Sequence, residues 1–383
     1  MSAPSVYRQT RQWLTYFVSP QVDESSRERL FLLVVGILRA ESVAPAAVAR
    51  ALATLAFSPA STESLERRVR RIENDPELQA PLCLHPLVRH YLRQVPSGRL
   101  ILILDPTTKA DQVVKVSVNL WYNQRTLPLA WTSWPANVPL QGARFWQRIA
   151  ALLAQVASLL PPGVPVIWLA DRAFGSPAFT DLLRPYGWHY VVRVQGQTRC
   201  QASNGQVTAV KELVAPGGRA KLVGQVFKKQ GWRTASVVVR WEAAYQEPLC
   251  VVSDLPCHWA LVALYRRRFA IEPSFRHEKS YGWHLEQCQV RDLDHLERLL
   301  VGMALASWLT LLVGSQQLAL STTQCPSQAQ RLQRKYSLFS IGLHCLQRLI
   351  SGAQEMRLQW RLCWQAEDPE IAALTLAASA PPG

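Results

Sequence analysis

Four polar residues in one short segment have the types and spacing of a phosphate-handling site. Arg268, Glu272 and Lys279 follow Tyr265 by three, seven and fourteen positions, and Arg267 stands beside them. At 3.6 residues per turn, these offsets return to nearly the same side of a helix. A phenol, a guanidinium, a carboxylate and an ammonium that point one way suit a metal-bound phosphate better than a solvated surface.

Two carboxylates upstream extend the pattern. Asp105 ends the apolar run RLILILD (99–105), and Asp171 ends the run VPVIWLAD (164–171). Such runs predict buried strands, and an acid at the carboxyl end of a strand lies where ligands of open α/β sheets collect. Either aspartate taken singly is more often a turn residue. The three carboxylates taken with the cationic segment favour a site.

Asp105, Asp171 and Glu272 therefore predict a catalytic metal centre. Carboxylate oxygens are hard ligands that favour Mg²⁺, with Mn²⁺ able to substitute. Two such ions about 4 Å apart suit in-line phosphoryl displacement. They would neutralise the phosphodiester, activate the attacking oxygen and stabilise the leaving oxygen.

These motifs resemble those of a known family. Y-x2-R-x3-E-x6-K around Glu272, preceded by Asp105 and Asp171, is similar to the DDE transposases of bacterial insertion sequences, in the group named for insertion sequence four. DRAF (171–174) is similar to the second motif of that family, D-R-G-[FY]. The resemblance spans roughly residues 30–315 and leaves the carboxyl-terminal part uncovered.

The resemblance implies roles for these residues. Asp105 would bridge two metal ions, Asp171 would hold one and Glu272 the other. Arg268 would grip a phosphate bidentately and Lys279 would act as a point charge. Tyr265 would supply a hydroxyl donor and a stacking face near the cleaved DNA end.

The family also implies a reaction and partners. Water cuts one strand, the freed 3′-hydroxyl often closes a hairpin, and the liberated end joins target DNA. The partners would be double-stranded transposon ends and target DNA, bound by a homodimer in a synaptic complex. The expected location is the bacterial cytoplasm, at the nucleoid.

Two departures from the family pattern keep rival functions open. Ala173 stands where the family has Gly, and Pro273 follows Glu272, where it predicts a kink. A catalytically decayed or domesticated DNA-binding relative is one alternative. A stand-alone nuclease without strand transfer is the other.

The composition favours a polyanionic partner. Lys and Arg number 42 against 27 Asp and Glu, a formal charge of +15. The excess gathers in two blocks, 196–235 and 320–363, which suit contact with a long duplex. Solvated loops without a ligand are the plainer interpretation of each block.

The remaining composition excludes several classes of protein. The eight cysteines lack C-x-x-C pairs, which predicts reduced thiols and no zinc site. The start of the chain has no apolar leader. The apolar stretch 299–314 falls short of the roughly 20 residues of a membrane span, so a buried helix is predicted and no membrane association.

The predicted fold class is α/β, and the resemblance implies a ribonuclease-H-like core. Residues 1–95 predict a separable helical DNA-binding domain, in which an arginine-rich helix (61–75) follows shorter helices; an ordinary helical bundle fits almost equally well. The expected parts are 1–95 (helical, DNA-binding), 96–195 (core, first part), 196–256 (β insertion), 257–318 (core, second part, with the Glu272 helix) and 319–383 (basic helical tail).

Within the core, strands are predicted at 99–105, 113–123, 127–135, 164–171 and 189–195, and helices at 143–160 and 176–185. Five further residues are predicted to contact DNA. Trp232 in the insertion would stack on an extruded base, although burial against the sheet is the commoner role of such a residue. The others are cationic: Arg172, Lys228, Lys229 and Arg233.

Overall fold

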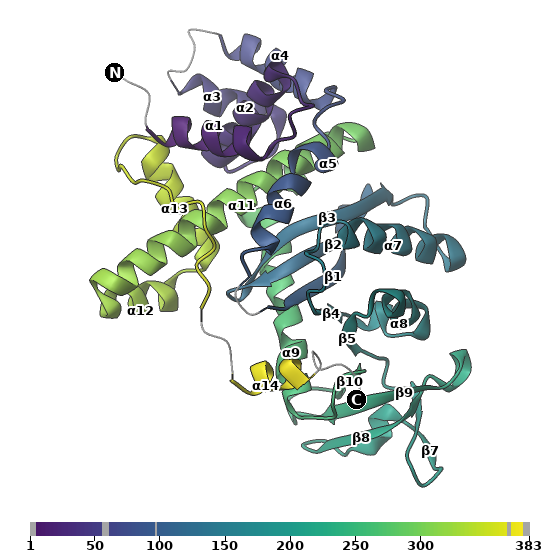
Figure 1. The fold of residues 1–383 in the computed structure, drawn as a ribbon. Coiled ribbons are helices and arrows are strands. Elements are labelled where there is room, and N and C mark those ends of the chain that lie inside the picture. Colours follow the sequence, from purple (N-terminus) through teal and green to yellow (C-terminus); the bar gives the residue numbers. More distant parts are fainter. Residues whose placement is uncertain (1–4, 56–60, 96–97, 366–368, 378–383) are drawn as a thin grey trace.

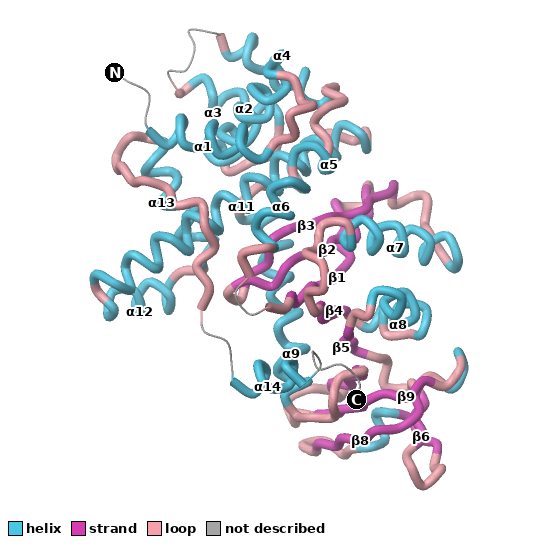
Figure 2. Tube along the Cα trace, viewed as in Figure 1, coloured by secondary structure: helices cyan, strands magenta, loops and turns pink. Residues whose placement is uncertain are grey.

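The structure is a mixed α/β fold built on one ten-stranded sheet with flanking helices (Figure 1). It is a computed structural model that describes residues 5–55, 61–95, 98–365 and 369–377. The strand order is β3-β2-β1-β4-β5-β10-β9-β8-β6-β7. Helices α1 to α4 lie at one end of the molecule, and β8 and β9 lie at the other (Figure 2).

The strands have the bounds β1 (Leu100–Lys109), β2 (Val113–Tyr122), β3 (Arg125–Pro135), β4 (Val166–Ala170), β5 (His189–Arg193), β6 (Arg199–Gln201), β7 (Val207–Ala209), β8 (Arg219–Val226), β9 (Arg233–Arg240) and β10 (Leu249–Ser253).

The α-helices have the bounds α1 (Ser5–Phe17), α2 (Glu24–Ala40), α3 (Pro45–Ala53), α4 (Thr62–Glu73), α5 (Ala80–Cys83), α6 (His85–Leu92), α7 (Gly142–Ala157), α8 (Pro177–Leu183), α9 (Ala260–Arg266), α10 (Ile271–Arg276), α11 (Leu293–Gln324), α12 (Pro326–Lys335), α13 (Leu338–Ile350) and α14 (Pro369–Ala377). Short helical turns near the candidate site are η1 (Arg172–Phe174), η4 (Lys228–Gln230), η5 (Arg267–Ala270) and η6 (His277–Tyr281).

Strand direction divides the sheet into two parts. β1, β4 and β5 run parallel, whereas β2 and β3 form an antiparallel edge. The strands of the predicted insertion continue the same sheet, because β10 pairs antiparallel with β5 and β9 pairs with β10. The insertion therefore covers the open edge of β5, which would otherwise expose unpaired backbone groups.

Alternation along β1 and β4 decides where the two aspartates point. Leu100, Leu102 and Leu104 pack into the larger apolar core. Ile101 and Ile103 pack into a second core on the opposite face. That second core also contains residues of α9, α10 and α14. Because successive side chains alternate between faces, position 105 shares the face covered by α9 and α10, and the same parity applies to position 171 after β4.

Strand β1 is longer than its apolar run predicts. Its antiparallel pairing with β2 continues from Asp105 opposite Ser117 to Lys109 opposite Val113. The prediction that the strand ends at residue 105 is therefore wrong, although the parallel pairing with β4 does end at Leu104. Asp105 thus lies within a strand but at the end of the buried parallel pair.

The turn between β2 and β3 is also earlier and tighter than predicted, because β2 ends at Tyr122 and β3 already begins at Arg125, whereas strands were predicted at 113–123 and 127–135. Asn123 and Gln124 both have left-handed backbones, with φ of 47° and 60°. Two such residues match the twist of a tight hairpin.

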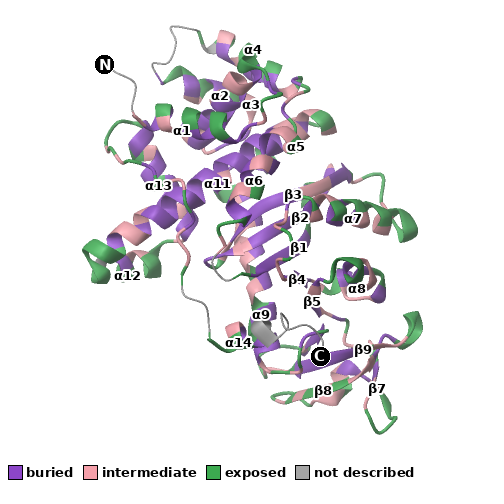
Figure 3. Ribbon diagram, viewed as in Figure 1, coloured by how far each residue is buried: buried purple, intermediate pink, exposed green. Residues whose placement is uncertain are grey.

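The amino-terminal helices do not form a separate core. Residues of α1 to α6 belong to one apolar cluster that also includes α11, α13 and the sheet. Helix α11 is long and apolar enough to cross a membrane, but 83% of its apolar window is buried inside the protein (Figure 3). The predicted buried helix at 299–314 is confirmed, within a longer element.

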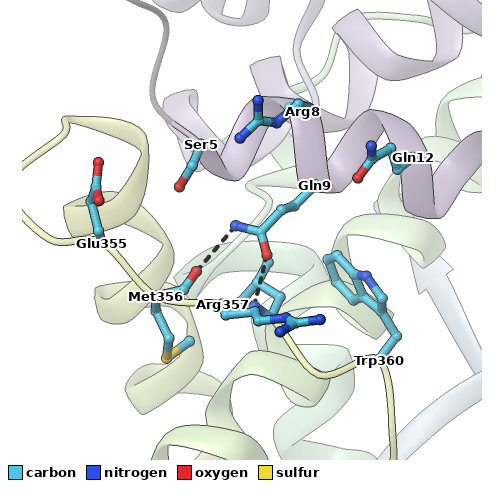
Figure 4. A pocket seen from close by; sticks show the side chains of 9 residues that line it. Ser5, Arg8, Gln9, Gln12, Glu355, Met356, Arg357 and Trp360 are labelled. Atoms are coloured by element: carbon cyan, nitrogen blue, oxygen red, sulfur yellow. Dashed lines mark hydrogen bonds between the residues drawn. The ribbon is translucent and has the colours of Figure 1, made fainter.

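The predicted helical tail is interrupted, since α13 stops at Ile350, an irregular strap (353–365) follows, and helix α14 then begins at Pro369. Side-chain amides bind the strap backbone: Gln9 accepts from the Leu358 N–H at 2.7 Å, and Gln316 donates to the Arg357 carbonyl at 2.8 Å. A groove of about 600 Å³ lies between α1 and this strap (Figure 4). It shares no lining residue with the carboxylates considered below.

A close crossing of α11 and α13 provides a test of this packing. A Cβ on Gly342 would stand 1.9 Å from the Thr310 carbonyl oxygen, which is backbone and cannot swing away. Gly342→Ala should lower the free energy of unfolding by roughly 1–3 kcal/mol, despite the better helix propensity of Ala. Chemical denaturation measures this change. The control is His344→Ala at an exposed position of α13, and equal stabilities of the two variants would contradict the packing.

Candidate active site

The segment that carries Tyr265, Arg268, Glu272 and Lys279 is helical throughout but changes pitch three times. Helix α9 passes into the 3₁₀ turn η5, then α10, then the π-helical turn η6. The segment is therefore helical, as its spacing predicts, but it is not one regular α-helix. The backbone changes from 3₁₀ to α at Ile271, so this change of pitch lies directly beside Glu272 and Pro273, where a kink was predicted.

Arg268 joins two of the predicted catalytic acids. Its guanidinium donates from Nη1 to Asp105 Oδ2 at 3.0 Å and from Nη2 to Glu272 Oε1 at 2.9 Å. Arg268 is 5% exposed and Asp105 is 8% exposed. The Glu272 side chain is 55% exposed. One buried cation thus holds a strand carboxylate and a helix carboxylate on the same face of the sheet.

The charge of Asp171 acts at the same place. Burial raises the pKa of Asp105 to about 6, Arg268 opposes the rise, and the negative charges of Asp171 and Glu272 add to it. Burial alone would lower the pKa of Arg268, but Tyr265 and all three carboxylates outweigh that effect and raise it. The three acids are therefore close enough to act electrostatically on one guanidinium.

Three buried atoms beside these groups lack hydrogen-bond partners among the described residues: Asp171 Oδ1, the Tyr265 hydroxyl and Arg268 Nε. Buried polar atoms are normally paired. Their gathering on one face next to ionised groups is typical of a site that binds a further polar or charged species.

Tyr265 does not present the expected stacking face. Its ring, on α9, is completely buried in the second apolar core, and burial raises the pKa of its hydroxyl to about 12. Lys279 is half-buried and lies 4.0 Å from Glu286, so its ammonium already has a carboxylate neighbour.

A second buried ion pair, which the sequence analysis missed, anchors the segment that carries Glu272 to the sheet. Lys115 of β2 bonds to Glu278 of η6, and both residues are buried. Thr126 of β3 donates to Ser274 of α10 at 2.8 Å. A lysine at an inward-facing position of an apolar strand, as in VVKVSV (113–118), is a signal that could have identified this anchor.

The donor set fits a hard divalent cation. Asp171 offers a buried oxygen that accepts no hydrogen bond from the described residues, and Arg268 neutralises ionised Asp105 and Glu272. Across the described ranges, however, no three His, Cys, Asp or Glu side chains are grouped closely enough to hold a metal ion as placed. Arg268 occupies the space between two of the acids, so the carboxylates converge without forming a closed ligand set.

The residues predicted to contact DNA are placed in two different ways. Arg172 is exposed on η1, and Lys228 and Lys229 are exposed on η4. Arg233 is instead bound to Asp181 of α8 at 2.8 Å, an ion pair that fastens β9 to the core. Trp232 is half-buried beside it.

A comparison with protein-family models supports a relationship between this chain and DDE transposases. Residues 146–309 match the family model described as Transposase DDE domain. The match covers Asp171 and the whole Tyr265–Lys279 segment, and it begins after Asp105. It supports transposase function in general. No curated protein matches the chain.

Solved structures of low identity were also found, among them two of a human nuclease. The catalytic domain of human Endonuclease V is 11% identical, with 72% of this chain and 96% of that chain covered and a TM-score of 0.26. A second structure of the human enzyme is 12% identical, with 57% and 92% covered and a TM-score of 0.22.

The raised pKa of Asp105 predicts how stability depends on pH. The folded pKa near 6 lies above the ordinary 3.8, so folding favours the protonated acid. This stabilisation is complete below about pH 4 and is lost as pH rises through about 6. In EDTA, the free energy of unfolding of Asp105→Asn should therefore rise relative to that of the wild type between these pH values. The expected rise is on the order of 2–3 kcal/mol.

Denaturation curves at several pH values measure this gain. Any constant cost of altering the Arg268 contact cancels in the pH dependence. The control is Asp111→Asn, at an exposed position in the turn after β1. A stability difference between Asp105→Asn and wild type that stays flat with pH would refute the burial of an ionisable Asp105.

Proposed function

We propose that this protein is a transposase of an insertion sequence that cuts and joins DNA strands at an active site formed by Asp105, Asp171 and Glu272. The observation that carries the proposal is the convergence of these acids on Arg268, from a strand, a strand end and a helix. The spacing of Tyr265, Arg268, Glu272 and Lys279 resembles the family of the insertion sequence four group, and the family match over 146–309 supports it.

Each acid has a distinct position in the proposed reaction. Asp105 lies on β1 and Asp171 directly follows β4, the parallel neighbour of β1, so these two acids form the rigid part of the site. Glu272 is more exposed, and the described residues hold its carboxylate through Arg268, so it is the acid best able to reorient. Two Mg²⁺ or Mn²⁺ ions held by these acids would supply charge neutralisation and an activated oxygen nucleophile.

Arg268 has two alternative partners in this proposal. In the DNA-free protein, it neutralises Asp105 and Glu272. A DNA phosphate offers the same bidentate geometry as a carboxylate. Binding of DNA can therefore draw the guanidinium toward the substrate and free the two carboxylates. Lys115 and Glu278 hold the helix in place meanwhile.

The order β3-β2-β1-β4-β5, with only β2 antiparallel to its neighbours, supports a ribonuclease-H-like core, extended by the strands of 196–256. We further propose that residues 1–95 and the basic blocks bind transposon ends and target DNA, in a homodimer that bridges two ends. The proposed location is the bacterial cytoplasm, at the nucleoid.

Replacing the acids tests the chemistry. Asp105→Asn, Asp171→Asn and Glu272→Gln should each lower metal-dependent nicking by on the order of 10³-fold, because each removes charge from the site. The substrate is a supercoiled plasmid carrying the DNA that borders the gene. Binding of the same DNA, measured by gel shift, should persist. Asp111→Asn is again the matched control, and a variant that still nicks at the wild-type rate removes its residue from the site.

A joining assay separates the transposase from a stand-alone nuclease or a decayed DNA-binding relative. Precut ends with free 3′-hydroxyls should be joined to a target plasmid by the wild type and not by Asp171→Asn. Nicking without joining would indicate a nuclease. DNA binding without either activity would indicate a relative that has lost its chemistry.

A further inference from the structure

A small cavity adjoins the segment that carries Glu272 and has no part in the proposed chemistry. It is formed where α10 and η6 meet β2, the start of β3, α11 and α13. Its volume is about 20 Å³, and a cavity needs about 10–15 Å³ to hold one water molecule. The space therefore admits one species of atomic size and excludes a nucleotide or any other ligand of several heavy atoms.

Several polar side chains in the lining already have partners within the fold. Thr126 donates to Ser274 at 2.8 Å, and both residues line the cavity. The carboxylate of Glu278, also in the lining, is bonded to the buried Lys115 ammonium. None of these contacts leaves a charge in the cavity without its opposite.

Two nitrogen atoms of lining residues are different. Arg125 Nε and His277 Nδ1 are buried and have no hydrogen-bond partner among the described residues, although buried polar atoms are normally paired. Burial lowers the pKa of His277 to about 4, and the positive charges of Arg125 and Arg276 add to this effect. His277 is therefore neutral near pH 7, and one of its two ring nitrogens carries a proton that it can donate.

The charge of Arg125 decides which kind of species fits. Its Nη1 donates to the Gln124 carbonyl oxygen at 2.8 Å, a neutral acceptor. Burial lowers the pKa of this guanidinium, and among the described residues no carboxylate opposes that effect. Because Lys115 balances Glu278 and His277 is neutral, the lining keeps one net positive charge. Burying a charge is costly unless it is paired, so a monovalent anion suits this cavity better than a neutral molecule or a cation.

The two donors come from separate elements that are both held in place. The His277 ring stacks on Phe339 of α13, with ring centroids 4.1 Å apart and ring planes 15° apart. The His277 carbonyl accepts from the Trp283 N–H at 2.8 Å. Arg125 is the first residue of β3, directly after the tight β2–β3 turn. A species bound by both donors therefore joins the η6 turn to this hairpin.

We propose that this cavity binds one chloride ion, held by the N–H groups of Arg125 Nε and His277 Nδ1. The ion neutralises the buried guanidinium. It also fastens the helical segment between Glu272 and Lys279 to the β2–β3 hairpin, so it positions the candidate active site without touching the substrate. This inference uses neither DNA nor a divalent metal ion and is independent of the proposed function.

Anomalous diffraction from wild-type crystals soaked in bromide tests the site directly, because bromide replaces chloride and gives an anomalous signal. A bromide peak is expected in the cavity, within hydrogen-bond distance of Arg125 Nε and His277 Nδ1. A water molecule at this place without a bromide peak would overturn the proposal.

Thermal unfolding measures the same binding in solution. At constant ionic strength, replacing gluconate with chloride should raise the unfolding temperature of the wild type until the site is saturated. Arg125→Gln and His277→Phe should each raise the chloride concentration that gives half of this effect by at least about tenfold, because each removes one donor. His277→Phe keeps a ring that can stack on Phe339, so loss of that packing does not account for its effect.

The matched control is Arg276→Gln, which removes the same charge from an exposed position of α10 outside the cavity. It should respond to chloride as the wild type does. Equal chloride responses of Arg125→Gln and Arg276→Gln would overturn the proposal. So would a wild type whose unfolding temperature is the same in chloride and in gluconate.

Hydrogen exchange tests whether the ion positions the helical segment. The backbone amides of 277–281 should exchange more slowly in chloride than in gluconate in the wild type, and equally in both salts in Arg125→Gln. Equal exchange in both salts in the wild type would refute the positioning role. Because these measurements need neither DNA nor divalent metal, their failure leaves the proposed cleavage reaction standing. Absence of nicking and joining with intact chloride binding would refute the proposed function alone.

Discussion

The site depends on one buried guanidinium. The Arg268 side chain is almost completely buried. Burying a charge is costly unless the charge is paired and hydrogen-bonded. Asp105 and Glu272 provide that pairing, and Asp171 adds its field. The same contacts hold the α9–α10 segment against the sheet at the point where two strand acids emerge. Arg268 thus both fastens the α9–α10 segment to the sheet and brings the carboxylates together.

Sheet geometry explains why these acids can meet although they are far apart in the sequence. β1 and β4 are parallel neighbours, and the odd-numbered positions of both point to the face covered by α9 and α10. A single-residue shift in register would turn either aspartate into the larger core. Ile101, Ile103, Ile167 and Leu169 fix that register by burying the same face.

Much of the site followed from local sequence patterns, and the rest required tertiary information. The apolar runs before Asp105 and Asp171 are visible because buried parallel strands are continuously apolar. The full length of β1 was not visible, because it depends on pairing with β2. The burial of Tyr265 and the pairing of Arg233 with Asp181 were missed for a related reason. Both depend on partners distant in the sequence.

Local sequence patterns also failed to predict two other features. These are the changes of pitch in the Tyr265–Lys279 segment and the irregular strap. A periodic pattern predicts that a helix exists, but close packing selects its local pitch. The strap has no periodic pattern, and it is held by single amides such as Gln9 and Gln316 from distant helices. Polar contacts of this kind leave no sign in composition or spacing.

The most direct test of the account is anomalous diffraction from crystals grown with Mn²⁺ and a cleaved DNA end. Manganese is expected within coordination distance of Asp105 and Asp171. The Arg268 guanidinium is expected to have moved from Asp105 to a DNA phosphate. Manganese bound elsewhere, with Arg268 still bridging Asp105 and Glu272 in the presence of DNA, would contradict it.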